Sequence, residues 1–523
     1  DVEDLAVGVA KQVHPRLGRE RLQLLLNPIG RHRATVAERL RRTIRRPPAG
    51  LAALLTAVLA LAPSAHAGGP GLVIGSTEDS VRSPLLAVSK AQMNLIALAG
   101  FDAVRITQIW SPGETGVTAA DQTILHNVTS AATLDAMQVL VSVLPYGSAT
   151  TPLTDTEQAD FAAYAASVAR AAPSVRIVII GNEPNLNRYW LPQFNDDGSD
   201  AAAPAYESLL ARTYDALKAE SPSLTVLGGA VSPRGGDVAG IRPTHSPTVF
   251  IRDLGAAYRA SGRTTPIMDG FAFHPYEDNS SVAPAAGTHP NTTTIALADY
   301  GKLVAVLGEA FDGTAQAGST LPIYYDEFGV ESVIPADKAS HYTGTEPATT
   351  KPVSEATQAA YYRQAIELAF CQPTVKALFL FHAFDEPALA GWQSGLYYAD
   401  GTPKSSLAAV RAAMELSRRG AVAACPGLRL AVHATASQQG SRLFLTCDLD
   451  CTYVAQLYRV PGKLLVSKRG RAIGKHASRL PFAVPKTTAR YRLRVSAVAA
   501  VNPGAATTLV QSVRPGGRPG GSS

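Results

Sequence analysis

The stretch that decides the fold is residues 175–185, VRIVIIGNEPN, in which a β-branched apolar run is followed at once by Gly181, Asn182, Glu183 and Pro184. A run of this composition and length is typical of a strand buried in a parallel sheet. Pro184 has no N–H to give to the ladder, so the strand ends before it. Glu183 is therefore predicted to lie at the carboxyl end of a buried strand.

A second stretch repeats this arrangement near residue 325. Residues 322–325, PIYY, form an apolar run and lead into Asp326-Glu327-Phe328-Gly329. Neighbouring strand residues point to opposite sides, so we expect Asp326 to point away from Glu327. In a barrel of parallel strands, the carboxyl ends of the strands lie at one rim, and the catalytic residues of barrel enzymes are found at that rim. The two glutamates are therefore predicted to face each other as a carboxylate pair.

Strands and helices alternate between these two stretches and on both sides of them. We predict strands at residues 72–75, 103–109, 138–144, 176–181, 225–229, 270–274, 323–327 and 377–382. Apolar residues at three- and four-residue spacing predict helices between them, for example at 157–171, 206–219, 355–370 and 405–417. Eight such units favour a (β/α)8 TIM barrel. The alternative is a doubly wound open sheet, but the Gly-rich turn usual after its first strand is replaced here by Ser76-Thr77-Glu78-Asp79.

The pattern changes to a period of two after Cys425. Short alternating runs at 428–432, 442–446, 453–457 and 491–495 predict a small all-β sandwich of immunoglobulin or fibronectin type. The Gly/Pro-rich end is predicted to be disordered. We therefore expect four parts: an N-terminal extension with a signal peptide at 1–67, the barrel at 68–425, the sandwich at 426–512 and a tail at 513–523.

The N-terminal part resembles an export signal. An Arg-rich segment, 41–46, precedes an apolar run at 51–61 and an Ala65-His66-Ala67 site, so we expect a signal peptide over about 41–67, cleavage after Ala67 and a secreted protein. The alternative, a membrane anchor, requires a longer apolar run. Residues 1–40 have little pattern, and we interpret them as an over-extended gene start.

Charge is distributed unevenly along the chain. There are 11 Lys/Arg and 5 Asp/Glu before Gly68, 22 and 35 from Gly68 to Cys425, and 15 and 2 from Pro426 onward. The net charges of these parts are thus +6, −13 and +13. The basic sandwich can contact an anionic polymer or a cell wall, or can simply be a solvated surface.

Four cysteines are present, at 371, 425, 447 and 451. The sequence contains no C-x-x-C pair and no His cluster beside them, so we expect no metal site. In an exported protein we expect the pairs Cys371–Cys425 and Cys447–Cys451, and the alternative is free buried thiols.

An Asn-Glu-Pro ending the fourth predicted strand, and a Glu followed by Phe-Gly ending the seventh, resemble the clan A retaining glycoside hydrolases. The resemblance covers about residues 70–420 and is greatest for the cellulase-like and β-xylosidase-like families. Phe271-Ala272-Phe273-His274-Pro275-Tyr276 on strand six, Arg105 on strand two and Trp392 after strand eight agree with it. Asp326 departs from it, because a small residue or Thr is usual before the nucleophile.

The resemblance implies roles for individual residues. Glu183 would be the acid/base and Glu327 the nucleophile, with Arg105 keeping Glu327 ionised. Asn182 would hold the substrate 2-hydroxyl, and His274 and Tyr276 would orient the nucleophile or bind sugar. Trp392 is the best candidate for stacking on a sugar. The other candidates are Trp110, Tyr189 and Trp190, for which the alternative is a role as loop anchors.

The predicted function is hydrolysis of O-glycosidic bonds in an oligo- or polysaccharide by a retaining double displacement. We expect no cofactor and no metal, a carbohydrate partner, no nucleic acid and a monomer. The alternatives are a non-catalytic carbohydrate-binding barrel and a transglycosylase.

Overall fold

The structure is a computed structural model that describes residues 68–422, 430–437, 441–448, 450–474, 476–485, 487–499 and 506–513. The predicted signal peptide, the extension before it and residues 514–523 of the predicted tail lie outside these ranges. Within them, no helix combines the length and the apolar character that crossing a bilayer requires.

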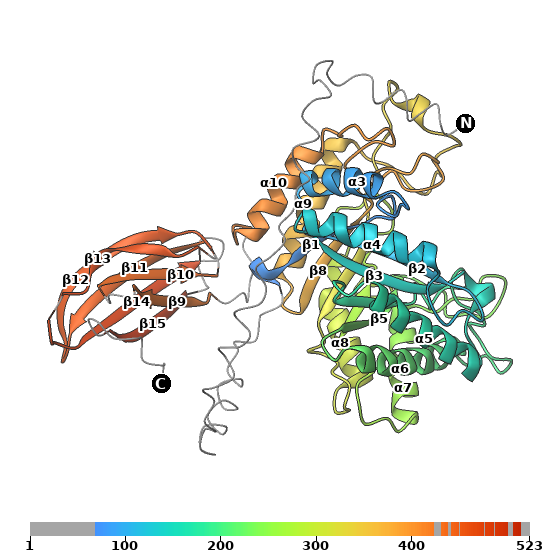
Figure 1. The fold of residues 1–523 in the computed structure, drawn as a ribbon, viewed down its shortest axis with the longest axis horizontal. Coiled ribbons are helices and arrows are strands. Elements are labelled where there is room, and N and C mark those ends of the chain that lie inside the picture. Colours follow the sequence, from blue (N-terminus) through green and yellow to red (C-terminus); the bar gives the residue numbers. More distant parts are fainter. Residues whose placement is uncertain are drawn as a thin grey trace, which may run out of the picture. The chain divides into compact units, whose positions relative to one another are not determined.

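Residues 73–381 contain a closed barrel of eight parallel strands in the order β1 to β8 (Figure 1). The strands are β1 (Val73–Thr77), β2 (Ala103–Trp110), β3 (Gln138–Pro145), β4 (Ile177–Ile180), β5 (Thr225–Val231), β6 (Gly270–Phe273), β7 (Ile323–Phe328) and β8 (Val375–Phe381). The predicted TIM barrel is therefore confirmed, and its strands lie where the apolar runs placed them.

Each strand is followed by an α-helix, and the helices surround the barrel (Figure 1). They are α3 (Leu86–Ala99), α4 (Ala119–Leu134), α5 (Asp155–Ala171), α6 (Ala202–Glu220), α7 (Pro247–Ala260), α8 (Tyr300–Phe311), α9 (Glu355–Cys371) and α10 (Leu407–Arg418). Short 3-10 helices occur at Gly69–Gly71, Ser148–Thr150, Leu297–Asp299 and Ala339–His341. Local sequence fixes several helix starts: Thr154 and Glu157, for example, form a capping box at the start of α5.

The inside of the barrel is filled in layers. Ala103, Leu140, Ile179 and Ala272 belong to one buried cluster. Because side chains alternate along a strand, residue 105, two positions after Ala103, also faces inward but lies one layer nearer the carboxyl ends. The apolar layer thus forms a floor, and the layer above it carries polar side chains.

The C-terminal all-β part consists of two antiparallel sheets, of order β13-β10-β9 and β12-β11-β14-β15. Its strands are β9 (Val432–Ala436), β10 (Arg442–Cys447), β11 (Cys451–Arg459), β12 (Lys463–Ala472), β13 (Ser478–Ala483), β14 (Tyr491–Ala499) and β15 (Ala506–Val513). Every second residue of β14 is buried, so one face of its sheet packs inward, as in the predicted sandwich.

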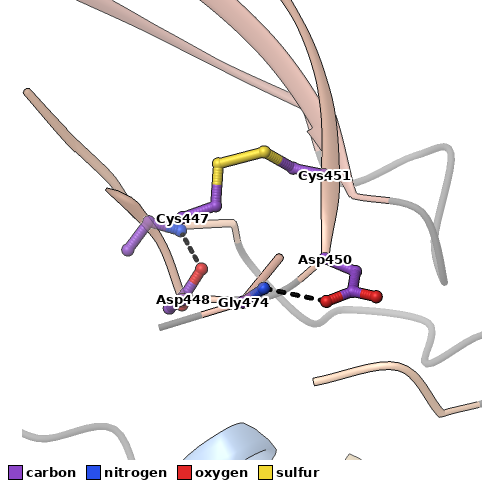
Figure 2. The surroundings of a disulfide bond; sticks show 6 residues. Cys447, Asp448, Asp450, Cys451 and Gly474 are labelled. Atoms are coloured by element: carbon purple, nitrogen blue, oxygen red, sulfur yellow. Dashed lines mark hydrogen bonds between the residues drawn. A yellow bond between two sulfur atoms is a disulfide. The ribbon is translucent and has the colours of Figure 1, made fainter. Parts of the chain in front are cut away.

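A disulfide joins Cys447 at the end of β10 to Cys451 at the start of β11, as predicted (Figure 2). Cys371 is also disulfide-bonded, and Cys425, its predicted partner, lies outside the described residues. The carboxylates of Asp448 and Asp450 lie in the same turn. They accept hydrogen bonds from the N–H groups of Ala431 and Gly474, each at 2.8 Å.

The prediction for the sandwich was incomplete. It placed the first strand at 428–432, whereas β9 begins at Val432. It omitted β12, β13 and β15, and the predicted tail includes Val513, which belongs to β15. The sequence of β12, KLLVSKRGRA, shows little alternation because the strand lies at a sheet edge and most of its residues are exposed.

Candidate active site

Glu183 lies just after β4, in a backbone conformation that L-residues rarely adopt. Its φ angle is 40° and that of Gly181 is 83°, both in the left-handed region, which costs a non-Gly residue about 1–2 kcal/mol. The N–H of Glu183 donates to the carbonyl oxygen of Ala230, near the end of β5, at 2.8 Å. The strand-end turn is therefore fixed by its neighbour.

Asn185 strengthens this connection between the two strand ends. It is fully buried. Its amide donates to the carbonyl oxygens of Ser232 and His245, and its Oδ1 accepts from the N–H of Ser232 at 2.9 Å. Three side-chain hydrogen bonds of Asn185 thus join the loop that carries Glu183 to the segments after β5.

Glu327 and Asp326 lie side by side near the end of β7, where the register with β8 shifts between Tyr325 and Phe328. Such an irregularity interrupts the alternation of side chains. Both carboxylates contact the same two cations, Arg105 and His274. The prediction that Asp326 points away from Glu327 was therefore wrong, because it assumed a regular strand.

Arg105 occupies the polar layer above the apolar floor and is 2% exposed. Its Nη1 donates to Glu327 Oε1 at 2.6 Å and its Nε lies 3.6 Å from Asp326 Oδ2. Its Nη2 reaches the hydroxyl of Ser142 on β3 at 3.2 Å and Oδ1 of Asn182 at 3.4 Å. One guanidinium thus connects β2, β3, β4 and β7.

His274, directly after β6, lies between the two glutamates and is fully buried. Its Nδ1 is 3.1 Å from Glu183 Oε1 and 3.4 Å from Glu327 Oε2. Those two carboxylate oxygens therefore cannot be farther apart than the sum of the two distances, about 6.5 Å. The predicted convergence of the two strand ends is present in the structure.

The charged groups of this cluster shift one another's pKa values. Burial lowers the pKa of His274, but the charges of Glu327 and Asp326 outweigh it and raise that pKa to about 10. Burial alone would raise the pKa of Asp326, but His274 and Arg105 hold it below its usual value. At neutral pH, His274 is therefore an imidazolium and Asp326 a carboxylate.

A cavity of about 370 Å³ opens over the two glutamates. Tyr276 donates its hydroxyl to Glu327 Oε2 at 3.1 Å, and burial and the charge of Glu327 raise its pKa, so the phenol stays protonated. Trp392 lies against Tyr276 with ring centroids 4.9 Å apart and against the edge of Phe381 at 5.3 Å. Tyr189 completes the aromatic lining.

Three further carboxyl groups, those of Glu277, Asp278 and Glu331, line this cavity. Burial, with the charges of Asp299 and Asp278, raises the pKa of Glu277 to about 9. Burial raises that of Glu331 to about 7, and its Oε2 accepts from the N–H of Gln393. Glu277 is thus neutral and Glu331 partly neutral near pH 7, so neither adds a full negative charge to the cavity.

Several sequence candidates do not reach the cavity. Trp110 is fully buried against Phe161, and Trp190 against Tyr206. Neither can stack on a ligand, so these two stacking predictions were wrong. No group of three or more His, Cys, Asp and Glu side chains within the described ranges could hold a metal ion.

Sequence reasoning missed the parts played by Ser142 and Asn185 and misplaced Asp326. Ser142 follows Leu140 by two positions on β3, so strand alternation could have placed it beside Arg105. Asp326 departs from the pattern of the family that the sequence resembles, and that departure was the available signal. Nothing in the sequence indicated the contacts of Asn185 with the segments after β5.

The structure was compared with known proteins. No protein-family model and no curated protein sequence matches the chain. Solved structures similar in fold include β-glucuronidase 2 of Bacteroides uniformis, bound covalently to cyclophellitol-6-carboxylate aziridine, at 13% identity and TM-score 0.42. That match covers 85% of this chain and 46% of the glucuronidase, so the chain spans less than half the length of that protein.

Two shorter proteins are also similar in fold. GH5_18 from Streptomyces cattleya, in complex with GlcNAc, has 16% identity and TM-score 0.46 over 67% of this chain and 81% of its own. A monomeric β-xylosidase from Caulobacter crescentus has 17% identity and TM-score 0.41 over 80% and 96%. All are glycoside hydrolases, and at these identities the likeness concerns the fold.

Proposed function

We propose that the protein is a secreted glycoside hydrolase that cleaves O-glycosidic bonds with retention of configuration. The observation that carries the proposal is the contact of one His274 nitrogen with both Glu183 and Glu327. Retaining enzymes hold their two carboxyl groups about 5–5.5 Å apart, whereas inverting enzymes need about 6.5–9.5 Å to admit a water. An oxygen separation of at most about 6.5 Å favours retention.

The charge state of the cluster supports a division of roles. Arg105 and the imidazolium of His274 supply two positive charges, and Asp326 and Glu327 two negative ones. These four charges cancel, so we assign the role of proton donor to the fifth group, Glu183. Glu327 accepts hydrogen bonds from Arg105 and Tyr276, which hold its carboxylate in place.

The chemistry then proceeds in two balanced steps. Glu327 attacks the anomeric carbon while Glu183 gives its proton to the departing glycosidic oxygen, so a glycosyl ester forms and the first product leaves. Water next attacks the anomeric carbon, Glu183 takes one water proton, and the ester bond to Glu327 breaks. The sugar leaves with its original configuration and both glutamates return to their starting states.

Side chains around the pair fit a sugar. Asn182, held by Arg105 through its Oδ1, would present its amide N–H₂ to the hydroxyl beside the anomeric carbon. Trp392 lines the cavity and offers a ring on which the C–H face of a sugar can pack.

The test combines turnover with trapping. Wild type should hydrolyse members of an aryl-glycoside panel, with the newly formed anomer retained by NMR. Glu327→Gln and Glu183→Gln should each lower kcat by more than about 10³-fold. A 2-deoxy-2-fluoro glycoside should leave a covalent sugar on Glu327, detected by peptide mass spectrometry. Glu309→Gln, a matched change in an exposed ion pair with Arg252 on the outer helices, should leave turnover unchanged.

The outcomes separate the alternatives. No turnover by wild type on a broad panel, together with binding of an oligosaccharide, would identify a carbohydrate-binding barrel instead. Products longer than the substrate would identify a transglycosylase. Inverted product would refute the double displacement even if both glutamates proved essential.

Secretion and a monomeric state are part of the same proposal. The disulfide between Cys447 and Cys451 suits an oxidising compartment. Expression of the full gene in a bacterial host should release a protein whose first residue is Gly68, by N-terminal sequencing. Light scattering should give the mass of one chain.

A further inference from the structure

The outward face of the four-stranded sheet β12-β11-β14-β15 carries a line of arginines that the barrel chemistry does not use. In β14, Tyr491, Leu493 and Val495 are buried, whereas Arg492 and Arg494 between them are exposed. The register pairs Arg492 with Tyr458 and Arg494 with Gln456 on β11. Burial and pairing therefore place these four residues on one solvent-facing surface.

The edge strand adds a second pair of arginines to this surface. Arg469 and Arg471 of β12 pair with Val454 and Thr452, which alternate with the buried residues of β11. We call the surface defined by Arg469, Arg471, Arg492 and Arg494 the arginine face.

The four side chains occupy four successive rows of the sheet. Along β11 the rows are marked by Thr452, Val454, Gln456 and Tyr458, which pair with residues 471, 469, 494 and 492 in turn. Rows on one face of a sheet are roughly 7 Å apart, so the arginines extend over about 20 Å along the strands. A line of this length suits a linear chain better than a small molecule.

Each pair of arginines lies beside its own hollow. A cavity of about 360 Å³ is lined by Arg492 and Arg494 together with Tyr458 and Pro461. A cavity of about 570 Å³ is lined by Arg469 and Arg471 together with Val454 and Val498. Aromatic and apolar groups beside guanidinium groups suit sugar rings that carry acidic groups, because C–H faces pack on the former and carboxylates pair with the latter.

Negative charge that could neutralise the arginine face is scarce. Residues 426–523 contain 15 Lys/Arg and only two acids, Asp448 and Asp450. Both carboxylates accept backbone N–H groups in the turn closed by the disulfide (Figure 2). The strand residues paired with the four arginines are uncharged.

We propose that the arginine face binds a linear acidic polysaccharide, one with carboxylates on successive sugars. The choice of a polysaccharide over another polyanion rests on the proposed function and on the apolar hollows, whereas the arginine face itself does not depend on the barrel chemistry. Such a site holds the enzyme on its polymer and raises the local concentration of bonds that the barrel can reach.

The test uses the full chain carrying Glu327→Gln, so that no polymer is cleaved. This protein should bind immobilised polygalacturonate at low salt, bind dextran at least about tenfold more weakly, and be released as NaCl is raised. Adding Arg492→Gln and Arg494→Gln should weaken binding to polygalacturonate by about tenfold or more. The matched control, Arg442→Gln with Arg479→Gln, removes the same charge from exposed positions of β10 and β13 and should change binding by less than about twofold.

Equal loss of binding in the two double variants would overturn the proposal, because net charge alone would then explain binding to the polymer. Binding of single-stranded DNA as tight as that of polygalacturonate would overturn the choice of ligand. Both double variants should show hydrogen exchange in peptides of β10, β13 and β14 like that of the parent protein, which shows that the substituted sheets fold. Failure of the hydrolase proposal would show as absent turnover. That measurement is independent of binding to the immobilised polymer.

Discussion

The mouth of the barrel and the arginine face both concentrate charge, but in opposite environments. At the mouth, Arg105 is 2% exposed and contacts two carboxylates, while at the arginine face Arg492 and Arg494 are exposed beside uncharged partners. A buried charge needs a close opposite charge to offset desolvation, whereas an exposed charge is solvated and screened by salt. The same residue type should therefore control stability in one region and polymer binding in the other.

The largest effect is expected from Arg105→Met. The substitution removes one of the two cations that Asp326 and Glu327 share, and breaking a buried pair in this way costs about 3–5 kcal/mol. All three tryptophans, Trp110, Trp190 and Trp392, belong to the barrel part of the sequence, so urea unfolding followed by tryptophan fluorescence reports on it alone. Arg494→Met is the matched control and should change that transition by less than about 0.5 kcal/mol. Similar losses of barrel stability in Arg105→Met and Arg494→Met would contradict the expected difference between the two regions.

The next largest effect is expected from raising the pH, which should lower the stability of the barrel. The pKa of His274 is raised from 6.5 to about 10 in the folded protein, so protonation stabilises the fold. This contribution is complete below about pH 6.5 and is lost as the pH rises through 10. The free energy of barrel unfolding should fall between pH 7 and 10, and fall less steeply in His274→Gln.

His433→Gln provides the control for that experiment, since this histidine is exposed on β9 of the sandwich. It should leave the pH dependence of barrel unfolding as in wild type. If the free energy of barrel unfolding depends on pH as steeply in His274→Gln as in wild type, His274 is not charged in the folded barrel.

A smaller and purely local effect is expected from Cys447→Ser with Cys451→Ser. The disulfide closes a very short loop, for which the chain-entropy relation gives about 2 kcal/mol. Hydrogen exchange followed by mass spectrometry should show faster exchange in peptides from β10 and β11. The tryptophan-detected transition of the barrel should stay in place, and a matching shift there would show that the two regions unfold together.

The smallest effect is expected from Arg492→Gln with Arg494→Gln. Solvent-exposed charges without a close partner contribute little to stability. The free energy of opening of β14, measured by hydrogen exchange, should therefore change by less than about 0.5 kcal/mol. Loss of more than about 2 kcal/mol would show that these arginines hold the sheet together rather than serve a ligand.

The sequence was most informative where backbone and side-chain signals agree. Buried parallel strands such as residues 177–180 are continuous apolar runs, and the runs of β4 and β7 lead directly into a Gly and an acidic residue, so the barrel and the positions of Glu183 and Glu327 could be predicted. Exposed edge strands lack that signal, and β12 was missed for this reason.

The errors in the site have a different cause. Asp326 was misplaced because a register shift in β7 depends on pairing with β8, which one strand's sequence does not record. Trp110 and Trp190 were misjudged because burial of an aromatic ring depends on which helices pack over it, here α5 and α6. Such outcomes are decided by contacts between segments distant in the chain.

The three hydrogen bonds of Asn185 have a practical consequence for engineering. Loop exchange on a barrel is a usual route to new substrates, and the segment after β5, which includes Ser232 and His245, borders the cavity through Ser232. Replacing that segment would also release the turn that aims Glu183. A graft that keeps both carbonyl acceptors and the Ser232 N–H should change what the cavity accepts while preserving the position of Glu183.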